Sequence, residues 1–69
     1  MPLAMADTGE KGIVRRVGGT EEVRRFLASL GFVTGAAVTI VSRTGGNLIV
    51  NIKDTRVAIN REMAGKIMI

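Results

Sequence analysis

The chain has 69 residues, and this length allows a single domain, predicted to span residues 1–69. It contains no Cys and no His, which excludes a disulfide framework and a zinc site built from thiolates and imidazoles. Ten Lys and Arg against six Asp and Glu give a net charge of +4, which suits nucleic acid, an anionic membrane surface or an acidic protein as partner, and equally suits a solvated surface without a partner.

The first residues do not have the pattern of a secretory signal. Three charged side chains interrupt residues 1–11, namely Asp7, Glu10 and Lys11, and no apolar run follows them. The longest apolar stretches, residues 36–41 and 48–52, are far shorter than the ~20 residues that a membrane span requires. The sequence therefore predicts a cytoplasmic protein without direct insertion into the membrane.

An N-terminal arm and a first strand are predicted in order along the chain. Residues 1–10 have the pattern of an extended arm, in which Leu3 and Met5 are spaced to dock on one side and residues 7–9 form a turn. Residues 13–17 are a basic run rich in branched side chains, which indicates a strand, and a pair of glycines ends it.

A helix is predicted after Thr20, whose hydroxyl is a suitable N-cap. Apolar side chains at i, i+3, i+4 and i+7 form one stripe along it: Val23, Phe26, Leu27 and Leu30. On its outer face Glu21 and Arg25 are placed for an i, i+4 ion pair, and Gly31 is the expected C-terminal cap. Both ends of this helix are therefore predicted by single residues.

Beyond residue 37 the apolar period changes to two, which indicates strands. Val38 and Ile40 share one face of the next strand, which leads into a hairpin turn at residues 44–47. Residues 48–53 form the partner strand, followed by a turn at residues 54–55. The side chains of this strand that should face the core are Leu48, Val50 and Ile52, and those that should face out are Ile49, Asn51 and Lys53.

The C-terminal part completes a small sheet. A strand is predicted at residues 56–59, after which Asn60 is positioned to cap one helical turn at residues 61–64. A last strand at residues 66–69 is expected to close the sheet against the first strand. The predicted fold is mainly β: a small SH3-like barrel of about five antiparallel strands with one α-helix inserted after the first strand, which leaves no long free edge.

Short motifs along the whole chain resemble those of the FeoA family. They are Pro2-Leu3, residues 9–12, Gly18-Gly19, residues 27–32, Gly35 and residues 64–69. Because each motif also has a structural task, such as ending the helix, the resemblance supports the fold and carries over no functional residue. It implies a small cytoplasmic protein that acts with FeoB, a membrane ferrous iron permease with a cytosolic GTP-binding domain. Because the sequence shows neither a helix-turn-helix segment nor a Walker-type motif, a free-standing accessory protein is expected.

Neither catalysis nor metal binding is predicted. The chain lacks His, Cys and Tyr and has no carboxylates paired at a suggestive spacing, so no enzyme activity is expected. The Gly65-Lys66-Ile67 sequence lacks the Ser or Thr of a phosphate-binding loop. Glu21 and Glu22 project ~100° apart beside basic neighbours and make a poor ferrous iron site. No cofactor is expected, and iron is the cargo of the system.

Seven residues are predicted candidates for contact with a partner. Four are arginines, Arg15 and Arg16 on the first strand and Arg24 and Arg25 on the helix, any of which is a candidate arginine finger for the GTPase of the partner or simply a solvated charge. Three are apolar residues expected on outward faces, namely Val41, Ile49 and Met68. They would form an interface unless the N-terminal arm covers them.

The predicted function is that of a small regulatory protein that binds FeoB, is recruited by it to the inner face of the membrane, and modulates Fe(II) uptake. The alternative is a basic barrel that binds RNA or another nucleic acid. The chain has no Trp or Tyr, and Phe26 and Phe32 are expected in the core, so nucleic acid is not expected as a partner. The same shortage of aromatic residues excludes a groove for proline-rich peptides. Weak self-association through exposed strands stays open.

Overall fold

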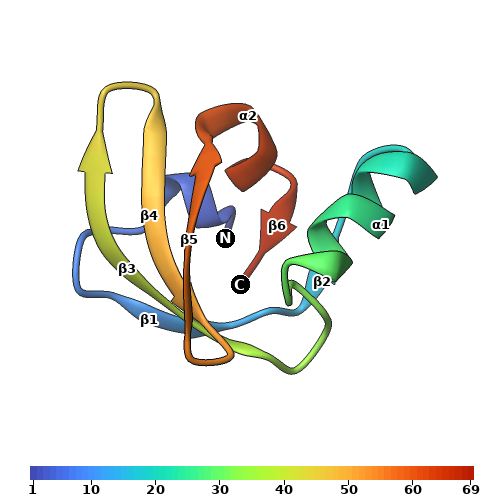
Figure 1. Ribbon diagram of the computed structural model, residues 1–69, viewed down its shortest axis with the longest axis horizontal. Coiled ribbons are helices and arrows are strands. Elements are labelled where there is room, and N and C mark those ends of the chain that lie inside the picture. Colours follow the sequence, from blue (N-terminus) through green and yellow to red (C-terminus); the bar gives the residue numbers. More distant parts are fainter.

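The computed structural model describes all residues 1–69 and consists of two antiparallel sheets and three helical segments (Figure 1). The larger sheet has the order β1-β3-β4-β5, and the smaller one pairs β2 with β6. The strands are β1 (Lys11–Ile13), β2 (Arg16–Val17), β3 (Ala37–Thr44), β4 (Asn47–Ile52), β5 (Thr55–Asn60) and β6 (Ile67–Met68). The helices are the 3-10 helix η1 (Leu3–Met5), α1 (Glu21–Ser29) and α2 (Arg61–Ala64). The mainly β architecture with α1 inserted before β3 confirms the predicted fold class.

The predicted strand at residues 13–17 is divided between β1 and β2, which belong to different sheets. Between them lies Val14, which is fully buried. Its N–H donates to the C=O of Ala36 at 2.9 Å, and its C=O accepts from the N–H of Gly35 at 2.8 Å. The chain therefore changes sheets around one core side chain, and six short strands form rather than about five. A run of branched residues does not reveal where a strand changes its pairing partner.

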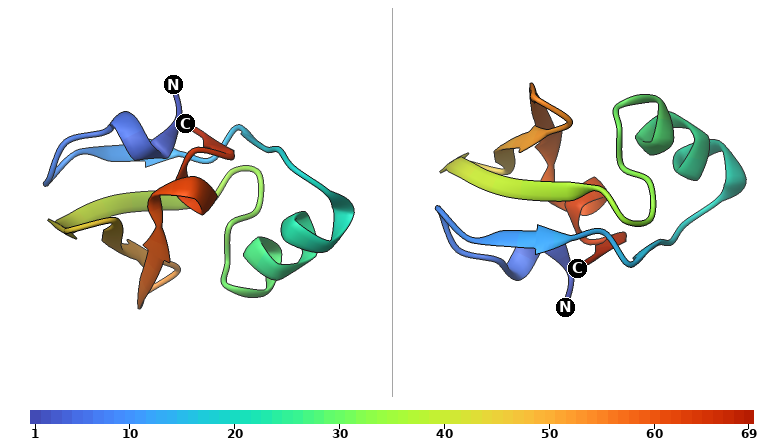
Figure 2. Two further views of the ribbon diagram at one scale, coloured as in Figure 1. Left: turned by 90° about the horizontal axis from the view of Figure 1, so that it is seen from above. Right: turned by 90° about the horizontal axis from the view of Figure 1, so that it is seen from below.

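The C-terminal strand closes the barrel by pairing on both of its sides. Arg16 of β2 lies opposite Met68, and Pro2 forms a bridge to the same residue. The first and last residues also bond to each other, because the nitrogen of Met1 donates to the C=O of Ile69 at 2.9 Å and the N–H of Ile69 donates to the C=O of Met1 at 2.8 Å. Figures 1 and 2 show the two ends of the chain side by side. The predicted closure of the last strand against the first is confirmed for β2.

The core contains 13 buried residues, all of them apolar, and no polar side chain is buried. In β4 the side chains of Leu48, Val50 and Ile52 are buried, whereas Ile49 and Asn51 face outward. This alternation confirms the predicted register of β4. The two-residue turn after Thr44 also lies within the predicted hairpin.

The β4–β5 hairpin turns one residue earlier than predicted. Lys53 and Asp54 have φ angles of 49° and 62°, the left-handed conformation that a two-residue turn of type I′ requires. Thr55 is already the first residue of β5, so the prediction of a turn at residues 54–55 is wrong by one position. Two charged side chains, rather than one, therefore stand at this end of the larger sheet.

The N-terminal segment forms η1 and is not an extended arm. Leu3 and Ala6 are fully buried, whereas Met5 is 71% exposed. The predicted docking of Leu3 and Met5 on one side is therefore correct for Leu3 only. Gly9, with a φ of 87°, lies in the predicted turn. Burial of Leu3 makes this segment part of the domain.

Helix α1 has the predicted ends. The Oγ1 of Thr20 accepts from the N–H of Val23 at 3.2 Å, which satisfies one of the free donors of the first turn. Gly31 has a φ of 109°, a conformation that a side chain would strain. The predicted pair is formed as well, with Arg25 Nη2 and Glu21 Oε1 separated by 2.9 Å.

Helix α1 buries less of its apolar stripe than predicted. Leu27 is fully buried and Val23 and Leu30 are partly buried, but Phe26 is 50% exposed. Both views in Figure 2 show α1 standing to one side of the strands. The expectation that Phe26 lies in the core is wrong, because half of its side chain is exposed to solvent and it does not belong to the core cluster.

A β-bulge in β3 determines the direction of Arg43. The pairing between β3 and β4 shifts at Val41, which is the extra residue, so that Arg43 lies opposite the buried Leu48. Without the extra residue the alternation of β3 would turn Arg43 to the outer face. Its guanidinium instead donates to the backbone C=O groups of Ala4 and Ala6. The bulge thus allows β3 to hold the N-terminal segment in place.

We expect Arg43→Met to lower the free energy of unfolding by about 1–2 kcal/mol, because it removes two charged hydrogen bonds to partly exposed carbonyls and keeps the apolar stem. Urea denaturation measures the change. Arg24→Met is the matched control, since Arg24 is exposed on α1 and should change stability by about 0.5 kcal/mol or less. Equal stability of the two variants would contradict the role given to Arg43.

We expect Leu27→Ala to destabilise the domain by about 2–4 kcal/mol, because a fully buried side chain is lost and a cavity is left. Phe26→Ala should cost about 1 kcal/mol or less, because half of that side chain is in water in the folded protein. Thermal and urea unfolding compare the two variants. A larger loss for Phe26→Ala would show that Phe26, against this description, is part of the core.

Candidate partner-binding surface

Strands β2 and β6 bring together two of the seven predicted contact residues, Arg16 and Met68. Arg16 and Met68 are directly opposite in the antiparallel register, so their side chains leave the same face. The backbone N–H of Arg15 donates to the C=O of Met68 at 2.7 Å. Arg15 and Arg16 are exposed and Met68 is partly buried. Residues 16 and 68 are called the Arg16–Met68 surface below, and Arg15, which precedes β2, is joined to it through its backbone.

The Arg16–Met68 surface combines an unpaired cation with a flexible apolar side chain. The one ion pair of the structure joins Glu21 and Arg25, so the guanidinium of Arg16 has no carboxylate within 4.0 Å. Beside Met68, Met1 is 52% exposed and bonds through its backbone to the adjacent C-terminal residue. A thioether side chain adapts its shape to different apolar partners. The surface therefore offers both charge and apolar contact.

Val41 and Ile49 lie in the other sheet, away from Met68 in the pairing pattern. Ile49 faces outward between two buried residues of β4, and the bulge places Val41 and Ser42 together opposite it. Both Val41 and Ile49 are partly buried. The outward direction predicted for Ile49 is confirmed, but the three apolar candidates are divided between two sheets and do not form one patch.

Arg24 and Arg25 lie on α1, which projects from the side of the strands (Figure 1). Arg25 is engaged with Glu21 in an exposed pair, with 78% and 70% of the two side chains accessible, and such pairs contribute little to stability. Arg24 is exposed. The helix thus carries its own basic group, separate from the Arg16–Met68 surface, and the role of an arginine finger stays a prediction for all four arginines.

The structure shows neither a cluster of metal ligands nor a helix long and apolar enough to cross a membrane. No three acidic, His or Cys side chains gather in a way that could hold a metal ion. Helix α1 has nine residues and α2 has four, and neither is a candidate for a span across a membrane.

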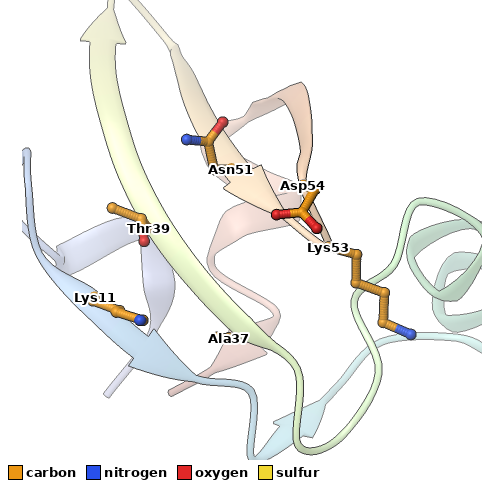
Figure 3. A pocket seen from close by; sticks show the side chains of 6 residues that line it. All are labelled: Lys11, Ala37, Thr39, Asn51, Lys53 and Asp54. Atoms are coloured by element: carbon orange, nitrogen blue, oxygen red, sulfur yellow. The ribbon is translucent and has the colours of Figure 1, made fainter.

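A polar hollow on the outer face of the larger sheet was not predicted from the sequence (Figure 3). Its volume is about 500 Å³, and its lining residues come from β1, β3, β4 and the turn after β4: Lys11, Ala37, Thr39, Asn51, Lys53 and Asp54. The alternation of β4 does indicate that Asn51 faces outward. The pairing that sets Lys11 beside Thr39 has no local signal, because it joins distant segments.

Known proteins resemble this chain over its whole length. The family model described as FeoA domain matches residues 1–69. An Fe(2+) transport protein A of Methanocaldococcus jannaschii is 32% identical over 68 residues, which cover 99% of this chain and 83% of the relative. The crystal structure of an iron uptake regulatory protein, FeoA, is 33% identical with a TM-score of 0.89, covering 97% of this chain and 89% of that one.

A further solved structure supports the description of the fold. The FeoA of Stenotrophomonas maltophilia, crystallised with zinc and described as a procaryotic SH3 domain protein, is 27% identical. It covers 99% of this chain and 87% of its own, with a TM-score of 0.86. This likeness confirms the SH3-like barrel that the strand pattern predicted.

Proposed function

The chain belongs to the FeoA domain family, and on that premise we propose that it is an accessory protein of ferrous iron transport that binds the cytosolic part of a FeoB-like transporter and modulates Fe(II) uptake. The observation that carries this proposal is the family match over residues 1–69, together with named relatives in iron transport. The proposed role is one of binding, with Fe(II) as the cargo of the transporter. The chain then acts at the cytoplasmic face of the membrane, where its partner recruits it.

The Arg16–Met68 surface is the proposed contact with the transporter. Its residues stand on paired backbone, which limits the conformational entropy that binding would remove. The guanidinium of Arg16 has no carboxylate partner within the chain, so it is available to acidic groups of another protein. The adjacent thioether groups supply apolar area at the same place. Arginine and methionine are both enriched in protein interfaces.

Capture of the transporter tests the proposal directly. The tagged chain is incubated with membranes that contain the FeoB-like transporter, with its GTPase held in the GDP-bound, GTP-bound or empty state. We expect specific capture, and we expect Arg16→Glu to weaken binding about tenfold or more, because it reverses a charge inside the contact. Arg24→Glu makes the same change of net charge on α1 and should leave binding unchanged.

The outcomes distinguish a wrong choice of surface from a wrong function. Equal loss with Arg16→Glu and Arg24→Glu would overturn the choice of surface, because net charge alone would then explain the effect. Absence of capture in every nucleotide state, together with normal Fe(II) uptake in cells that lack the chain, would overturn the proposed function. Circular dichroism of both variants verifies that they are folded.

A further inference from the structure

The register of the larger sheet aligns four polar side chains in one row across its outer face. Lys11 of β1 pairs with Thr39 of β3, Thr39 pairs with Asn51 of β4, and Asn51 pairs with Arg56 of β5. Residues paired in this way project from the same face. The residues before and after Thr39, Val38 and Ile40, are buried, which places the row on the side away from the core.

The hollow described above lies along this row. Lys11, Thr39 and Asn51 line it from three neighbouring strands, and the turn residues Lys53 and Asp54 line it at one end (Figure 3). The early turn of the β4–β5 hairpin is what brings both turn residues to this position. Arg56 extends the row beyond the hollow onto the edge strand. These side chains come from four strands and one turn, and no local sequence motif unites them.

The charges of this face are largely unpaired. Lys11, Lys53 and Arg56 are exposed and belong to no ion pair, while Asp54 is the one carboxylate of the hollow. Within the row the single hydrogen bond between side chains runs from Arg56 Nε to Asn51 Oδ1, and at 3.5 Å it is long. Most of the donors therefore point to water and are free to bind an acidic group.

We propose that this cationic sheet face, residues 11, 39, 51, 53 and 56, binds an acidic segment of a partner protein in extended conformation. Neighbouring strands are ~4.8 Å apart, so the two ends of the row, on β1 and β5, are separated by about 14 Å. An extended chain advances ~3.4 Å per residue, which puts two carboxylates about 14 Å apart when they are four positions apart. The face thus matches a Glu-x-x-x-Glu segment that crosses the strands.

Two features favour a polypeptide over a nucleic acid. Asp54 is placed at one end of the hollow. Its carboxylate can bind an N–H or a basic side chain of a polypeptide, but it repels the phosphate that a nucleic acid carries at every nucleotide. The face also carries no aromatic ring on which a base could stack, since Phe32 is buried and Phe26 lies on α1. This inference is independent of the identity of the transporter and of the Arg16–Met68 surface.

An NMR titration of the full ¹⁵N-labelled chain tests the proposal, with the capped peptide Ser-Glu-Gly-Ser-Gly-Glu-Ser as probe at low salt. We expect saturable shifts at the backbone amides of the cationic sheet face and none at residues 15–17. A peptide of equal charge with adjacent glutamates should bind at least about threefold more weakly, because it reaches only one end of the row. Folding of every variant is monitored in the same spectra.

Matched double variants distinguish the effect of this face on peptide binding from the effect of net charge. Lys11→Gln with Arg56→Gln should weaken the peptide about tenfold or more, whereas Arg24→Gln with Arg61→Gln, which removes the same charge elsewhere, should change it less than about twofold. Equal loss in both doubles, shifts spread over all basic residues, or no saturable shift would each overturn the proposal. Tighter binding of a uridine oligonucleotide to the same residues would also overturn it, in favour of nucleic acid.

Discussion

The pairing of β6 with both ends of the chain is the constraint on which the rest of this structure depends. The strand is only two residues long, yet it bonds to β2 on one side and to Pro2 on the other, and it holds Ile67 fully buried in the core. Without it β2 has no partner, the smaller sheet does not exist, and the N-terminal segment loses its pairing with the end of the chain. The same segment is also held by burial of Leu3 and Ala6 and by the guanidinium of Arg43, which the bulge of β3 turns toward η1.

The same closure creates one candidate surface and leaves the other independent. Arg16 and Met68 are 52 positions apart in the sequence and meet only because their strands pair. The cationic sheet face lies instead on the outer side of the larger sheet, where the register of four strands assembles it. A partner bound at one surface therefore does not have to displace a partner bound at the other.

Local interactions could be predicted from the sequence, and non-local ones could not. Thr20 and Asn60 both cap helices as predicted, because an N-cap bonds to a backbone group three residues away. The predicted alternation of buried and outward residues in β4 is also confirmed, because one face of this strand is buried. The change of sheet at Val14 and the bulge at Val41 depend on which strand lies alongside, and the apolar pattern carries no such information. Phe26 matched its stripe yet is exposed, because only packing decides how wide the buried part of a helix is.

For the two candidate surfaces too, local features could be predicted from the sequence and non-local ones could not. Arg16 and Met68 were predicted singly, as an exposed charge and an outward apolar group, but not as neighbours. The row that begins at Lys11 was not predicted, because its members share no local motif. Membership of the FeoA domain family could be predicted, since its landmarks are turns and caps spread along the whole chain. Landmarks of this kind specify a fold, and the surfaces that act on partners are assembled by pairing.

Hydrogen exchange of the chain with and without the cytosolic part of a FeoB-like transporter tests the central claim most directly. The amides that report on the closure donate across the β2–β6 ladder and between the chain ends: Arg15, Gly18 and Ile69. The account predicts that saturating transporter slows exchange at these amides and leaves those of α1 unchanged. Unchanged exchange at all three amides, or slowing confined to α1, would contradict the claim that the partner docks where the last strand closes the barrel.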